Sequence, residues 1–174
     1  MPAASATSTP YFLFVGALEP RKAPDVLAEG FRLARGRGLE AELVVVGEGR
    51  IAPGGDGVRR LGRVEDPGAL YAGALAVVLP SWLEGFGLTP VEGLAAGAPA
   101  IVSDLPVLRE VLGEGALYVR PGDAEDLAGA LLALAGDPAL RARLLEAGRA
   151  AIAPLSWAET ARRTRAVLAG AAGA

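Results

Sequence analysis

The sequence contains no cysteine and no histidine. The first absence excludes disulfides and thiolate metal sites. The second removes the commonest general base and the commonest metal ligand. No apolar run approaches the roughly 18 residues of a membrane span. The net charge is −3, without a basic block, which argues against nucleic acid as a partner.

The chain has 174 residues, of which 52% are hydrophobic, enough for one compact domain with a core. Residues 1–10 are polar and lack the apolar segment of a signal peptide. We therefore predict a flexible lead-in at 1–10, followed by one domain at 11–174. A cytoplasmic location is expected, and any membrane contact would belong to a part of the protein outside this sequence.

Apolar runs of strand length alternate with helical patterns along the chain. Strands are predicted at 11–16, 42–47, 58–62, 75–80, 99–104 and 116–119. Helices are predicted at 24–38, 66–74, 89–97 and 106–113, and in three pieces from residue 123 onward, divided by Pro138 and Pro154. Nearly continuous apolar strands, each followed by a helix, are typical of a parallel sheet covered on both faces. The predicted fold is α/β, a single Rossmann-like doubly wound parallel sheet.

The segment PSWLEGFGLTPVEGLAAG, residues 80–97, follows the predicted fourth strand. It contains two glutamates, Glu84 and Glu92, around a glycine-rich turn. One interpretation is purely structural: Thr89 is the N-cap of the next helix, and Glu92 completes a capping box with it. Asp66 is interpreted as the cap of the preceding helix.

The second interpretation concerns a ligand. A helix N-terminus favours an anion such as a diphosphate, and glycines let the backbone approach it closely. Carboxylates aimed at a diphosphate would repel it, so Glu84 and Glu92 should accept hydrogen bonds from hydroxyls on either side of it. A nucleotide sugar has hydroxyls in both places, on the sugar and on the ribose.

The stretch EGFGLTPVE resembles the Glu-x7-Glu motif of the retaining glycosyltransferases of the GT-B fold, in the group 1 or GT4 family. Four further segments resemble the same family: YFLFVGALEPRK, ELVVVGEG, VRRLGRVEDPGALYAGALAVVLPS and GLAAGAPAIVSDLPVLREVLGEGALYVRPGD. The resemblance covers residues 11 to about 168. It implies that the chain is the C-terminal, donor-binding half of such an enzyme.

The roles of the family's residues can be carried over where positions match. The resemblance implies that Glu84 contacts donor-sugar hydroxyls and that Glu92 holds the ribose. It places Lys22, with Arg21 beside it, on the departing diphosphate. The other donor-binding positions, which would act through backbone groups, are Gly16, Val64, Phe86, Gly87, Leu88 and Thr89. Among these, Gly16 would meet the diphosphate and Val64 the nucleobase.

Two departures from the family matter. Ala17 stands where the family often has an arginine, and Arg21 is the candidate substitute for that charge. The family also has an N-terminal acceptor-binding domain, which this sequence lacks. We therefore expect the isolated chain to be inactive.

The expected activity of the parent protein is transfer of a sugar from a UDP-, GDP- or other nucleoside-diphosphate donor, with retention of configuration. The resemblance implies no cofactor, and since no Asp-x-Asp occurs, no metal site is predicted. The alternative is a non-catalytic nucleotide- or glycan-binding module of the same fold. A dehydrogenase is excluded, because Gly47 and Gly49 do not match the dinucleotide-binding glycine pattern. Trp82 and Trp157 are interpreted as packing anchors.

Overall fold

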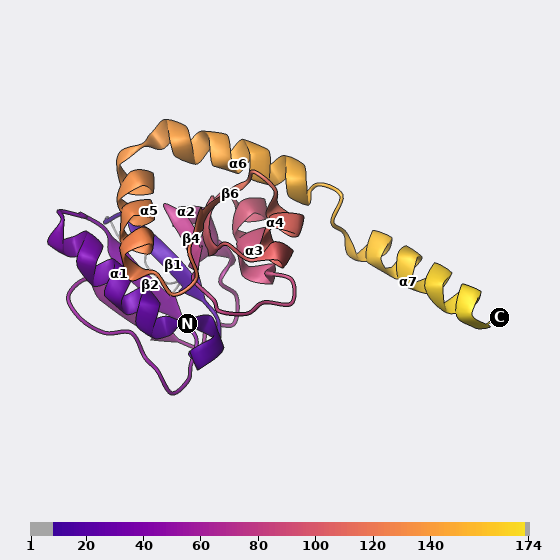
Figure 1. Cartoon of the computed structure of the whole chain (residues 1–174), viewed down its shortest axis with the longest axis horizontal. Helices are drawn as coiled ribbons and strands as arrows, with labels where there is room; N and C mark the ends of the chain where they lie inside the picture. The colour runs from indigo at the N-terminus through magenta and orange to yellow at the C-terminus, as the bar shows by residue number, and fades with distance from the viewer. Residues whose placement is uncertain (1–8, 173–174) are drawn as a thin grey trace.

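The structure, a computed structural model, describes residues 9–172. Residues 1–8 of the predicted lead-in lie outside the described residues. Six parallel strands form one sheet in the order β3-β2-β1-β4-β5-β6, with helices around it (Figure 1). The strands are β1 Tyr11–Val15, β2 Glu42–Val46, β3 Val58–Gly62, β4 Ala76–Leu79, β5 Ala100–Ser103 and β6 Ala116–Val119. The helices are η1 Pro20–Lys22, α1 Pro24–Gly36, α2 Gly68–Gly73, α3 Leu88–Ala96, α4 Pro106–Leu112, α5 Ala124–Gly136, α6 Pro138–Ile152 and α7 Trp157–Ala172.

Alternate residues of each strand point to opposite faces of the sheet, and both faces are buried. On one face, Phe12, Phe14 and Val45 pack in a cluster with residues of α1 and α5. On the other face, Leu13 and Val77 pack with α2 residues, and further strand residues pack with α3 and α4. The doubly wound parallel sheet predicted from the apolar runs is confirmed.

The predicted strands and helices all occur, and most of their ends match or differ by one or two residues; the short helix η1 was not predicted. The prediction of Asp66 as the cap of the second helix is wrong, because α2 begins at Gly68 with Pro67 as its N-cap. Asp66 instead accepts a hydrogen bond from the Gly68 N–H at 2.8 Å. The aspartate thus forms a local side-chain turn just before the helix, a common alternative to capping.

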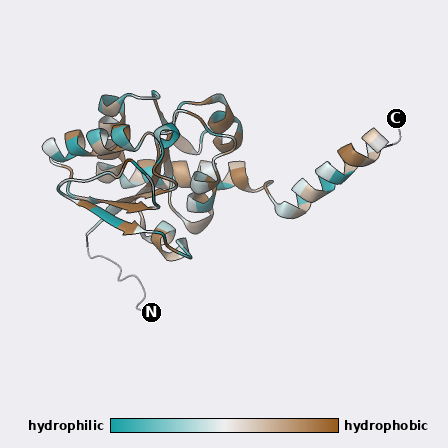
Figure 2. Ribbon diagram, turned by 90° about the horizontal axis from the view of Figure 1, so that it is seen from below, coloured by the Kyte–Doolittle hydropathy of each residue, from teal (hydrophilic) through white to brown (hydrophobic). Residues whose placement is uncertain are grey.

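Helix α7 extends away from the rest of the molecule (Figures 1 and 2). Its first residue, Trp157, is 82% exposed, so the prediction that it anchors packing is wrong. Trp82 is 50% exposed, yet its ring packs so closely on Gly122 that a Cβ there would lie 2.0 Å from it. No helix within residues 9–172 is both long and apolar enough to cross a membrane.

Candidate functional site

The two loops that carry the predicted site leave neighbouring strands in the middle of the sheet. Strand β1 pairs with β2 on one side and with β4 on the other. The chain adds β2 and β3 outward from β1 and then crosses to β4, so its winding direction reverses between β1 and β4. In open α/β sheets, ligands bind at the carboxyl ends of the strands at such a switch point. The loops after Val15 and Leu79 therefore flank the expected ligand position.

A short basic turn follows β1. The Gly16 N–H donates to the last carbonyl of β2 at 3.0 Å, and the chain then enters η1, which carries Arg21 and Lys22. Ala23, with a left-handed φ of 50°, joins η1 directly to α1. The backbone N–H of Trp82 donates to the Arg21 carbonyl at 2.8 Å. This bond fastens the loop after β4 to the basic turn.

The structure brings Lys22 and Glu84 into direct contact. The Lys22 ammonium donates to Glu84 Oε1 at 2.6 Å, and the two side chains are only 11% and 7% exposed. The charges are 62 positions apart in the chain and meet because their loops leave adjacent strands. Arg21 is different: its side chain is 50% exposed and pairs with Glu19 at 3.2 Å. The structure therefore does not bring Arg21 to the buried pair.

Helix α3 begins earlier than the sequence predicts and has no side-chain cap. Its N-cap is Gly87, with a φ of 89°, so the prediction of Thr89 as N-cap is wrong. A side chain at position 87 would be strained by that φ, and its Cβ would lie 2.5 Å from Leu108 Cδ2. Phe86 and Leu88 flank the start and are both exposed. The helix start thus offers backbone N–H groups and the positive end of its dipole at an open surface.

Glu92 does not form the predicted capping box. Its Oε2 accepts a hydrogen bond from the Tyr71 hydroxyl at 2.7 Å. The Thr89 hydroxyl donates to the Val15 carbonyl, at the end of β1, over 3.3 Å. The capping prediction failed because the helix starts at a glycine, which places Thr89 inside it.

Tyr71 is the site residue that sequence reasoning missed. Its side chain is 3% exposed and packs in the apolar cluster beneath α2. Burial, and then the hydrogen bond and charge of Glu92, raise the pKa of Tyr71 well above its ordinary value, so the phenol remains a donor. A buried tyrosine usually needs an acceptor, which was the only signal available. The sequence does not reveal that the acceptor is Glu92.

The predicted nucleobase position lies at the end of β3. A hollow of about 420 Å³ is lined there by Arg63, Val64 and Glu65. Val64 is half-buried and packs against the same apolar cluster that contains Tyr71. The Val64 backbone and the Tyr71–Glu92 pair are therefore supported by one packed unit.

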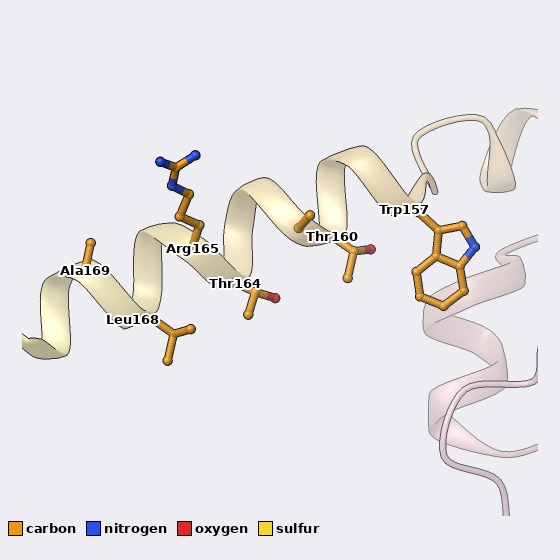
Figure 3. A pocket seen from close by; sticks show the side chains of 7 residues that line it. Trp157, Thr160, Thr164, Arg165, Leu168 and Ala169 are labelled. Atoms are coloured by element: carbon orange, nitrogen blue, oxygen red, sulfur yellow. The ribbon is translucent and has the colours of Figure 1, made fainter.

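A larger hollow of about 670 Å³ lies along α7 and away from these loops (Figure 3). Its lining comes entirely from α7: Trp157, Thr160, Ala161, Thr164, Arg165, Leu168 and Ala169. One exposed helix does not enclose a ligand, so the switch point remains the candidate site.

Comparison with known proteins identifies the family of the chain. A family profile described as "Glycosyl transferases group 1" matches residues 9–137. The chain is 34% identical over 175 residues to a D-inositol 3-phosphate glycosyltransferase of Nocardiopsis dassonvillei, with 87% of this chain and 41% of the relative covered. It is 36% identical over 162 residues to a phosphatidyl-myo-inositol mannosyltransferase of Mycobacterium leprae, with 86% and 43% covered.

Solved structures show the same fold. Sucrose-phosphate synthase from Thermosynechococcus elongatus superposes with a TM-score of 0.78 at 28% identity, covering 94% of this chain and 46% of that protein. HepE from Anabaena, solved in complex with UDP and glucose, superposes with a TM-score of 0.80 at 19% identity, covering 92% and 48%. The chain therefore spans less than half the length of each of these proteins.

Proposed function

The chain belongs to the group 1 glycosyltransferases, and from that premise we propose that it is the donor-binding half of a retaining, metal-independent enzyme. The donor would be a nucleoside-diphosphate sugar, such as a UDP- or GDP-sugar. The acceptor would be bound by an N-terminal domain that this sequence does not include. The single observation that carries the proposal is the buried contact between Lys22 and Glu84 at the switch point of the sheet.

The buried ion pair suits a site that exchanges partners with its ligand. A lysine and a glutamate held out of water must each keep a partner, because an unpaired buried charge is strongly unfavourable. A donor supplies both partners at once: its diphosphate replaces Glu84 at Lys22, and its sugar hydroxyls replace Lys22 at Glu84. A nucleoside diphosphate without sugar supplies only the first. The pair therefore favours the intact donor.

The surrounding groups suit the remaining parts of such a donor. The uncapped start of α3, from Phe86 to Thr89, and the Gly16 backbone would receive the diphosphate. Glu92 would accept hydrogen bonds from the ribose, and the backbone at Val64 would meet the nucleobase. When the glycosidic bond breaks, its electron pair moves to the diphosphate oxygen. Fixed donors aimed at that developing charge are the strongest contribution a protein makes to such a step.

A thermal-shift screen of the chain with UDP-, GDP-, ADP- and dTDP-sugars tests the proposal. A ligand at 100 times its dissociation constant adds about 2.7 kcal/mol to the free energy of unfolding, or about 5–10 °C for a chain of this size. The free nucleosides serve as controls and should shift the melting temperature much less. No shift with any nucleotide would contradict the donor-binding role.

A non-catalytic nucleotide- or glycan-binding module is the alternative, and Ala17 favours it. Without an arginine at that position, and with Arg21 paired to Glu19, less positive charge faces a departing diphosphate. Donor turnover by the full-length protein, with both halves present, distinguishes the two functions. Donor binding without transfer or hydrolysis would support the module.

A further inference from the structure

The hydrogen bond between Tyr71 and Glu92 joins two helices on one face of the sheet. Tyr71 lies on α2 and Glu92 on α3, 21 positions apart. We propose that Tyr71 is a positioning residue, whose hydroxyl holds the Glu92 carboxylate in the orientation that receives the two hydroxyls of a ribose. This inference rests on the proposed function and adds to it a residue that fixes the ribose specificity of the site.

A glutamate side chain without a partner is flexible. Glu92 has three rotatable side-chain bonds and is itself exposed, so without a partner it would occupy many rotamers and lose that freedom on binding. Tyr71 holds Oε2 at 2.7 Å, while Oε1 has no hydrogen-bond partner within residues 9–172. The carboxylate thus keeps one whole oxygen and a second lone pair on Oε2 for accepting hydrogen bonds. Two adjacent hydroxyls need two such acceptor positions.

The tyrosine is held more rigidly than the glutamate it contacts. Its ring is 3% exposed and lies among apolar residues such as Val46 and Val77. The Thr89 hydroxyl, on the same helix as Glu92, donates to the Val15 carbonyl at the end of β1. The Tyr71 hydroxyl is therefore a fixed donor. It fixes the orientation of the Glu92 carboxylate relative to the sheet, which the flexible Glu92 side chain would not do by itself.

A second tyrosine in the same apolar cluster provides the contrast. Tyr11 is 7% exposed, and its hydroxyl donates to the Leu70 carbonyl on α2 at 2.8 Å. That bond satisfies a buried phenol within the core and reaches no carboxylate. The Tyr71 hydroxyl, by contrast, donates to Glu92, an exposed acidic side chain of the candidate site. Tyr11 is thus a matched control for loss of a buried phenol hydroxyl.

The test compares Tyr71→Phe with Tyr11→Phe in the 174-residue chain. Calorimetry measures the binding of UDP, GDP and ADP, and of the 2′,3′-dideoxy form of each. For the nucleotide that binds, Tyr71→Phe should weaken the ribose form by about five- to tenfold, the scale of the net contribution of one typical hydrogen bond. The dideoxy form should change less than about twofold. Tyr11→Phe should leave the ratio of ribose to dideoxy affinity unchanged, even if it lowers the melting temperature.

Fluorine NMR keeps the inference testable if Tyr71→Phe folds poorly. The chain has three tyrosines, which can be replaced throughout by 3-fluorotyrosine and assigned through Tyr11→Phe and Tyr118→Phe. The Tyr71 resonance should move when the ribose nucleotide binds and move less with the dideoxy form, while the Tyr11 resonance stays in place.

Each other outcome overturns the inference. Equal losses for ribose and dideoxy nucleotides would make Tyr71 a structural residue only. Unchanged ribose affinity in Tyr71→Phe, with Glu92→Gln still lowering it, would remove Tyr71 while leaving the proposed function intact. Binding of no nucleotide by the wild-type chain would overturn the proposed function and this inference with it.

Discussion

The buried pair of Lys22 and Glu84 makes a quantitative prediction about stability. Replacing Lys22 with methionine keeps the aliphatic stem and removes the ammonium. Glu84, 7% exposed, then loses the partner that lay 2.6 Å away. Breaking a buried ion pair by removing one partner costs about 3–5 kcal/mol. The side chains face an open site, so we expect the lower value, about 3 kcal/mol.

The single change at Glu84 and the double change at Lys22 and Glu84 complete a double-mutant cycle. Glu84→Met should destabilise the chain by a similar amount, because it leaves the ammonium unpaired. The double variant with methionine at both positions should return to wild-type stability or exceed it by about 1–4 kcal/mol, as found when apolar residues replace a buried pair. The two single variants together lose about 6 kcal/mol of unfolding free energy. The expected coupling energy between Lys22 and Glu84 is therefore at least that large. That result would show that the pair does not stabilise the fold, in keeping with the proposed role in ligand binding.

Urea unfolding at pH 7 measures the free energy of unfolding of all four proteins. An unchanged slope of that free energy against urea concentration shows that all four undergo the same transition. Calorimetry with a nucleoside diphosphate and its parent nucleoside measures the effect of each change on ligand affinity. Lys22→Met should weaken the diphosphate by about 1.5–3 kcal/mol more than the nucleoside, the range for a hydrogen bond to a charged group. Additive single losses would show that the buried pair is not coupled. Equal losses for both ligands would refute the phosphate role of Lys22.

Three further predictions follow from other parts of the structure. Gly87→Ala should lower the free energy of unfolding by about 1–3 kcal/mol, because alanine is strained at a φ of 89° and its Cβ meets Leu108; wild-type urea stability would contradict this. Glu92→Gln should leave stability nearly unchanged, since the side chain caps no helix, but should weaken ribose nucleotides by about 1–3 kcal/mol and spare dideoxy forms; equal calorimetric losses would refute it. Trp157→Ser should change stability by less than about 0.5 kcal/mol, because the side chain is 82% exposed; a larger urea shift would show that α7 packs on the body.

The sequence by itself determined the parallel sheet and the succession of strands and helices along the chain. Strand and helix periods are local properties, so runs such as residues 42–47 and 116–119 identified their strands to within about a residue. It also located the loops of the candidate site, because the carboxyl ends of parallel strands share one edge. The Glu-x7-Glu segment belongs to this local information, and so does the resemblance that it supports.

Only the tertiary structure decided which side chains meet. Lys22 and Glu84 come from loops far apart in the chain, and no local pattern shows that their strands are neighbours. The start of α3 depended on Gly87, which adopts a φ of 89° and has no Cβ to collide with Leu108. Glu92 could have capped the helix in isolation, but the folded chain places a buried phenol within 2.7 Å of it. Such partners depend on packing between distant segments, which residue spacing alone does not specify.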